Sequence, residues 1–152
     1  MNFSVVEKNI GYRFKDRRLL MRALTLASYD NKSCNETLEF FGDAIIEFIV
    51  SEKIFALDAD EGELTERRKD VVSDAALTPI SKRLKLDENL IKGEGDNRNK
   101  KAVPSVYEAI VAAIYLDGGM DAAKEFVLST LDFSFKDKDE NFKGGLQETL
   151  QK

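Results

Sequence analysis

The stretch NETLEFFGDAIIEFIVSEKIFA, residues 35–56, predicts the longest helix of the chain and with it the fold class. Asn35 is a residue type that favours helix N-caps. The apolar residues that follow recur at helical spacing around a broad face: Leu38, Phe41, Ala44, Ile45, Phe48 and Ile49. A face this broad predicts a central helix that is largely buried.

Helical spacing continues on both sides of this stretch. The chain of 152 residues has two prolines and nine glycines, and few segments combine β-branched residues with alternating apolar positions. We therefore predict an all-α fold with a single domain over residues 1–132. Further helices are expected over residues 3–9, 16–24, 63–72, 73–84, 104–117 and 121–131. Residues 133–152 are expected to form a charged linker that ends in the start of another helix.

Three carboxylates lie on one side of the predicted long helix. Glu36, Glu39 and Asp43 stand at i, i+3 and i+7, within roughly 60° of one another around the helix axis. Acids this close repel one another unless a cation lies between them, so the pattern indicates a metal site. The alternative is a solvated face, because acids in a first helical turn also favour the helix dipole.

Glu108 is the one charged residue in the stretch VYEAIVAAIYL, residues 106–116. An acid on an otherwise apolar helix needs a metal, a cation or a hydrogen-bonding role. A second interpretation is helix capping, since Ser105 and Glu108 form an S-x-x-E capping box directly after Pro104. The sequence leaves both interpretations open.

The chain contains no histidine and a single cysteine, Cys34. This composition excludes imidazole acid–base catalysis, Ser-His-Asp triads and nearly all catalytic zinc sites. A bound metal would need oxygen ligands, which favours Mg²⁺, Mn²⁺ or Ca²⁺. The single cysteine fits a reducing compartment, and we expect a cytoplasmic location.

Two bulk properties bear on the partners of the chain. The longest apolar run, residues 109–116, is far shorter than the ~18 residues that a membrane span needs, so no membrane is expected as a partner. The net charge of −5 is a mild argument against nucleic acid, which binds basic surfaces. Acids gathered at a metal site would, however, lower the net charge while a basic face persists elsewhere.

The motif NETLEFFGDA, residues 35–44, resembles the signature of the ribonuclease III family, usually E-R-L-E-F-L-G-D-A. Further segments resemble family motifs in the same order: IGYRF at 10–14, LL and ALT within 19–25, EGELT at 61–65 and YEAIVAAIYLDGG at 107–119. The resemblance covers residues 3–131. It implies an all-helical endonuclease domain, a bundle that forms a two-fold homodimer.

The activity that this resemblance implies is hydrolysis of double-stranded RNA with Mg²⁺, or Mn²⁺ as a substitute, to 5′-phosphate and 3′-hydroxyl ends. Glu39, Asp43 and Glu108 match the family's metal ligands, and Asp43 and Glu108 are also expected to be catalytic. Glu36 and Glu61 match acids that support the site or the RNA around it, and we count them among the expected catalytic residues.

The same resemblance predicts contact surfaces. Phe40 matches the aromatic residue that packs into the partner subunit, and we expect Phe41 at the same interface. Phosphate contacts are expected from two basic clusters, comprising Arg67, Arg68, Lys69, Arg98, Lys100 and Lys101. Ordinary solvated charge is the alternative for both clusters.

The chain departs from the family pattern at Ser105, where the family has an aspartate that is the fourth metal ligand. A neutral hydroxyl is a weaker ligand than a carboxylate. The family's usual C-terminal double-stranded-RNA-binding domain does not follow, whether cut off or lost. Two functions stay open: a magnesium-dependent endoribonuclease, or a catalytically degenerate dimer that binds RNA or serves in assembly.

Overall fold

The computed structural model describes residues 2–97 and 99–134, which form seven α-helices and one 3-10 turn. The elements are α1 (Phe3–Ile10), α2 (Arg17–Leu24), α3 (Glu36–Phe55), α4 (Glu61–Val72), α5 (Asp74–Arg83), η1 (Asp87–Asn89), α6 (Asn99–Gly118) and α7 (Met120–Thr130). The predicted all-α class is confirmed. The short helix predicted near the end of the linker lies outside the described residues.

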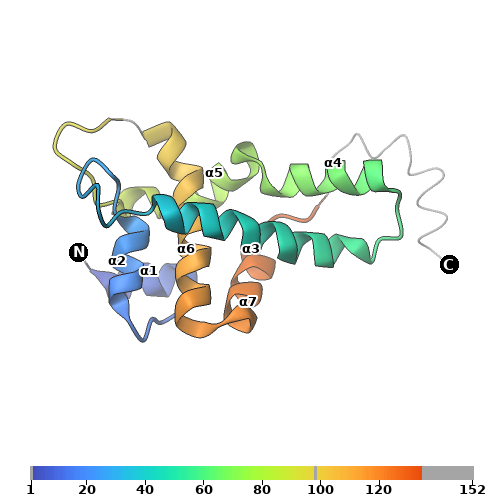
Figure 1. Cartoon of the computed structure of the whole chain (residues 1–152), viewed down its shortest axis with the longest axis horizontal. Coiled ribbons are helices and arrows are strands. Elements are labelled where there is room, and N and C mark those ends of the chain that lie inside the picture. Colours follow the sequence, from blue (N-terminus) through green and yellow to red (C-terminus); the bar gives the residue numbers. More distant parts are fainter. Residues whose placement is uncertain (1, 98, 135–152) are drawn as a thin grey trace.

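Helices α3 and α6 form the centre of the fold, where α6 crosses α3 (Figure 1). Most of α6 is buried, because it packs against α2, α3, α5 and α7. The two central helices meet backbone to backbone at Gly42, where a β-carbon would collide with the carbonyl group of Glu108. This close approach brings Asp43, the residue after Gly42, next to Glu108.

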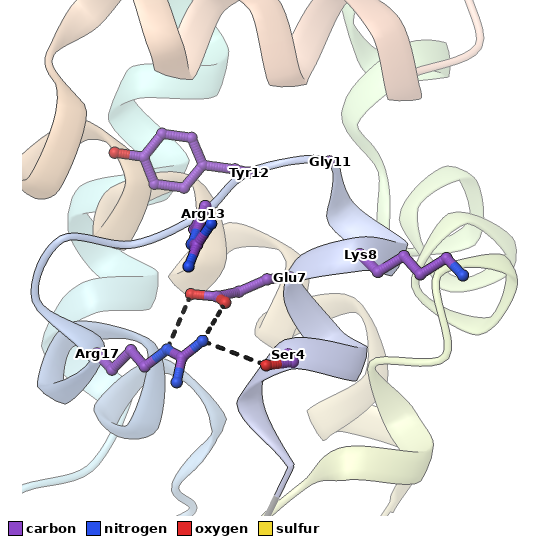
Figure 2. Close-up of a pocket in the computed structure, with 7 residues that line it drawn as sticks. All are labelled: Ser4, Glu7, Lys8, Gly11, Tyr12, Arg13 and Arg17. Carbon is purple, nitrogen blue, oxygen red and sulfur yellow. Dashed lines mark hydrogen bonds and ion pairs between the residues drawn. The ribbon is translucent and has the colours of Figure 1, made fainter.

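An ion pair between the buried Glu7 and the half-exposed Arg17 joins α1 to α2 (Figure 2). The Glu7 carboxylate accepts hydrogen bonds from the Arg17 guanidinium at 2.8 Å and from the Phe14 backbone N–H at 2.9 Å. These bonds hold the pKa of the Glu7 carboxyl below its usual range. Asp117 of α6 accepts a hydrogen bond from the Lys15 backbone N–H at 2.9 Å, so the loop between α1 and α2 is tied to the centre of the fold.

Helix α6 begins at Asn99, earlier than the predicted start at Pro104. Pro104 lies inside the helix, near its N-terminal end, where the missing N–H removes one backbone hydrogen bond. Ser105 consequently stands in the helix interior and does not occupy the N-cap. The capping-box interpretation of Ser105 and Glu108 is therefore wrong.

Helix α3 is less buried than its sequence predicts. Its inner face, which includes Ile45 and Ile49, is buried in the core. Phe40, Phe48 and Phe55 on the other side are 80%, 56% and 77% exposed. The prediction of a largely buried helix is wrong for this second face, because only one side of α3 has other described helices to pack against.

The remaining boundaries follow the predicted pattern closely. The break between α4 and α5 falls at Ser73, whose hydroxyl accepts a hydrogen bond from the Ala76 N–H at 3.2 Å. Within residues 2–97 and 99–134, no helix combines the length and the apolar character needed to cross a membrane. The predicted domain end at residue 132 follows α7 and stays a prediction.

Candidate active site

Acidic side chains from three helices line one hollow beside the crossing of α3 and α6. We call this hollow the acidic pocket, and its lining residues are Glu36, Glu39, Phe40, Asp43, Asp74, Lys101 and Glu108. The structure thus brings Glu108 of α6 to the three acids that share one face of α3. Their roles as catalytic groups or metal ligands stay predictions.

The Glu108 carboxyl is held among other acids. Burial, the adjacent Asp43 carboxyl and the charge of Glu39 together raise the pKa of Glu108 to about 8. An acid whose charge is disfavoured in this way gains strongly from a nearby cation. Because perturbed acids of this kind cluster at functional sites, the electrostatics of the acidic pocket favour a cation-binding role.

Ser105 acts on the acidic pocket through Glu39. The Ser105 side chain is buried, and its Oγ donates a hydrogen bond to Oε2 of Glu39 at 2.8 Å. Ser105 lines a second hollow, which it shares with Glu36, Glu39 and Lys101, and is absent from the lining of the acidic pocket. In this arrangement the hydroxyl orients the Glu39 carboxylate.

Sequence reasoning missed Asp74 and the place of Lys101. Asp74 stands in the first turn of α5 and lines the acidic pocket. Its Oδ2 lies 3.3 Å from Nζ of Lys101, a residue that the sequence predicts as an RNA contact. The only local signal of Asp74 is its place directly after the N-cap Ser73, where acids are common, so no sequence pattern singles it out.

The donor set of the acidic pocket suits a hard divalent cation, because carboxylate oxygens are the ligands that Mg²⁺ and Mn²⁺ prefer. Glu39, Asp43 and Glu108 fit that chemistry. Among the described residues, however, no three such side chains already converge as a ligand cage. Binding would therefore include side-chain adjustment within the pocket.

Glu61 does not join the acidic pocket. It is the first residue of α4, which follows the C-terminal end of α3, whereas the pocket acids lie on the N-terminal half of α3. A helix of this length spans about 30 Å, so Glu61 lies far from the pocket of its own chain. The predicted supporting role of Glu61 would require a site formed elsewhere.

The structure separates the predicted RNA contacts. Arg67 is unsuited to that role, because its side chain is 7% exposed and its Nε pairs with Glu63 at 3.0 Å. Arg68 is half-buried and pairs with Glu47 of α3, whereas Lys69 is exposed. Lys100 lines a hollow next to the acidic pocket. Arg98 lies outside the described residues.

The two predicted interface residues differ in environment. Phe40 is 80% exposed at the rim of the acidic pocket. Phe41 is 37% exposed, and its ring meets the Tyr115 ring of α6 edge to face at 5.4 Å. Phe40 is thus free to contact a partner, whereas Phe41 already packs partly within its own chain.

Comparison with known proteins places this arrangement in context. A family model described as Ribonuclease-III-like matches residues 16–133. Ribonuclease 3 of Sulfurovum sp. (strain NBC37-1) is 33% identical over 162 aligned residues, which cover 99% of this chain and 73% of that protein. Ribonuclease 3 of Oleidesulfovibrio alaskensis is 42% identical over 138 residues, covering 83% of this chain and 60% of that protein.

A solved structure shares the fold. The nuclease domain of Ribonuclease III from Campylobacter jejuni matches with a TM-score of 0.81 at 31% sequence identity, covering 85% of this chain and 95% of that chain. That structure is described as flexible in a region involved in dimer formation. At this identity and coverage the likeness extends over the whole helical domain.

Proposed function

Because this chain belongs to the ribonuclease III family, we propose that its acidic pocket is the active site of an endoribonuclease. The reaction is hydrolysis of double-stranded RNA to 5′-phosphate and 3′-hydroxyl ends. The observation that carries the proposal is the approach of Asp43 to Glu108 at the Gly42 contact, where burial and the Asp43 carboxyl together raise the pKa of Glu108 to about 8. A cluster of acids this unfavourable is explained by a cation that neutralises it.

The cation in this proposal is Mg²⁺, with Mn²⁺ as a substitute. Glu39, Asp43 and Glu108 would hold it. When bound, the ion polarises the phosphodiester and lowers the pKa of a bound water. The Ser105 hydroxyl holds Glu39 in position through its hydrogen bond.

The substrate side of the proposal rests on exposed basic residues and on dimerisation. Lys69 and Lys100 are exposed and suited to phosphate contacts, which read duplex RNA by shape and backbone. A homodimer would present two acidic pockets to one duplex. A cytoplasmic location belongs to the same proposal, because the single cysteine fits a reducing compartment.

One observation favours a second function. Ser105 supplies a neutral hydroxyl where the family has a carboxylate, so the pocket holds its cation with less negative charge. A catalytically degenerate dimer that binds RNA without cutting it would also keep the family's fold. Retention of Glu36, Glu39, Asp43 and Glu108 in one pocket argues for the enzyme.

A cleavage assay on long duplex RNA separates the two functions. The wild-type chain is assayed with Mg²⁺ and then with Mn²⁺, beside Asp43→Asn and the matched control Asp121→Asn, an exposed acid of α7 outside the pocket. We expect cleavage by wild type and by Asp121→Asn, and none by Asp43→Asn. Duplex binding without cleavage under both metals would establish the degenerate function.

A further inference from the structure

Lys101 is the one cation among the described residues that line the acidic pocket. Its Nζ lies 3.3 Å from Oδ2 of Asp74, so the pair bridges α6 and α5 across the pocket. The second hollow, with Glu36 and Glu39, is also lined by Lys101. Asp74, Glu39 and Glu108 all raise the pKa of the Lys101 ammonium, which therefore stays charged among these acids.

From this placement we infer that Lys101 is an internal counter-cation of the acidic pocket, anchored by Asp74, which a divalent ion must displace in order to bind. The inference rests on the proposed cation-binding role of the pocket and is independent of RNA cleavage. Its physical basis is that the ammonium offsets the repulsion between Asp43, Glu39 and Glu108 before metal binds. The same positive charge then repels an entering divalent ion.

The exposure of the Lys101–Asp74 pair allows a divalent ion to take the place of the Lys101 ammonium. The Lys101 and Asp74 side chains are 77% and 61% exposed, and ion pairs this accessible to water are weak. A lysine ammonium on a flexible four-carbon stem moves away without disturbing its helix. Asp74 is then released as an additional carboxylate, in a pocket where Ser105 contributes only a hydroxyl through Glu39.

The test is Mn²⁺ binding to the whole chain, measured by calorimetry without RNA. Lys101→Gln should bind Mn²⁺ at least about fivefold more tightly than wild type, the effect of removing a unit charge several ångströms from a divalent ion in water. Lys101→Arg keeps the charge and should bind like wild type. Lys82→Gln is the matched control, because Lys82 belongs to α5 and lines the neighbouring hollow with Asp74, outside the acidic pocket.

A second readout is the melting temperature in a chelator and in Mg²⁺. Without metal, Lys101→Gln should melt below wild type, because the acids have lost their counter-charge. Saturating Mg²⁺ should raise its melting temperature more than that of wild type.

Three outcomes would overturn the inference: unchanged or weaker Mn²⁺ binding by Lys101→Gln, no Mn²⁺ binding by that variant, or equal tightening in Lys82→Gln. If Lys101→Gln binds Mn²⁺ more tightly while no variant cleaves RNA, the counter-cation inference stands. In that case only the proposed enzymatic activity fails.

Discussion

At the scale of single residues, Ser105 acts on the acidic pocket through its hydrogen bond to Glu39. Its hydroxyl satisfies one oxygen of Glu39 through a 2.8 Å hydrogen bond, which stabilises the chain without metal but adds no charge for a cation. A carboxylate at the same position would have the opposite effects: it would lower the stability of the metal-free chain and add charge for a cation. The reason is that a further acid beside Glu39 repels it in the absence of metal and attracts a divalent ion when one is present.

We therefore expect Ser105→Asp to bind Mg²⁺ more tightly and to cleave duplex RNA at lower Mg²⁺ concentration. Without metal it should be less stable than wild type by about 1–3 kcal/mol, because the added acid is buried next to Glu39. A magnesium titration of cleavage and thermal denaturation in chelator measure the two effects. Ser105→Ala is the control, since it loses the hydrogen bond without adding charge and should not improve metal binding. An unchanged magnesium dependence of Ser105→Asp would show that position 105 does not influence the metal.

Glu108→Gln should be inactive both in the wild-type chain and in Ser105→Asp.

The acids of the candidate site were only partly predictable from the sequence. Glu36, Glu39 and Asp43 share one helix, so helical spacing alone groups them. Glu108 stands out because it is the one charge in an otherwise apolar helical stretch. Asp74 depends on a tertiary contact between α5 and α6, and no local pattern reports such a contact.

At the scale of elements, the crossing of α3 and α6 at Gly42 positions the site. Gly42→Ala should destabilise the chain by about 3 kcal/mol or more, because the new methyl group collides with the rigid backbone carbonyl of Glu108. Separation of the helices would also move Asp43 away from Glu108 and weaken divalent binding. Denaturant unfolding and Mn²⁺ titration measure both. Gly62→Ala is the control, since its β-carbon would meet only Oδ1 of Asp60, the N-cap of α4, at an ordinary 3.5 Å. This variant should be neutral or stabilising by up to about 1 kcal/mol. A stable Gly42→Ala chain with unchanged Mn²⁺ affinity would contradict this account.

The contact between α1 and α2 carries a prediction on pH. The pKa of Glu7 is lowered in the folded chain, so its stabilising contribution is present above its unfolded value and is lost as the pH falls through the folded value. Glu7→Gln should be less stable than wild type at pH 7 by about 2 kcal/mol. This difference in unfolding free energy should shrink as the pH falls from about 5 toward 2. Thermal melts of both proteins across this pH range measure the difference. Glu52→Gln, which breaks the exposed pair with Lys124, should change stability by less than about 1 kcal/mol at any pH. If the stability difference between wild type and Glu7→Gln does not change with pH, the ion pair is excluded as its cause.

Element positions were predicted better than element ends. The break at Ser73 follows from local sequence, because its hydroxyl caps the next helix. The start of α6 does not follow from local sequence. Proline is common as the first residue of a helix, yet Pro104 lies inside this helix. Asn99 begins the helix five positions earlier, in the polar stretch NKK, where no apolar spacing marks a helix.

At the scale of the whole molecule, the exposed aromatic residues of α3 bear on assembly. Phe40, Phe48 and Phe55 are all more than half exposed, although the sequence pattern of α3 indicates a largely buried helix. Both observations are explained if a second copy covers this face. A two-fold axis would bury the same patch on both chains, which agrees with the proposed homodimer.

We expect the chain to sediment at micromolar concentration as a dimer of its 17.1 kDa protomer. Phe40→Glu should shift the population to monomer, because a two-fold contact would desolvate the new charge in both copies without giving it a partner. Tyr29→Glu is the matched control, since Tyr29 is 58% exposed in the loop before α3 and the substitution introduces the same charge outside α3. Circular dichroism should show native helix content in both variants, because neither side chain belongs to the core.

Two outcomes would contradict this account of the dimer. Sedimentation of the wild type as a monomer throughout the micromolar range would exclude the proposed dimer. Dissociation by Tyr29→Glu as well as by Phe40→Glu would contradict an interface centred on α3.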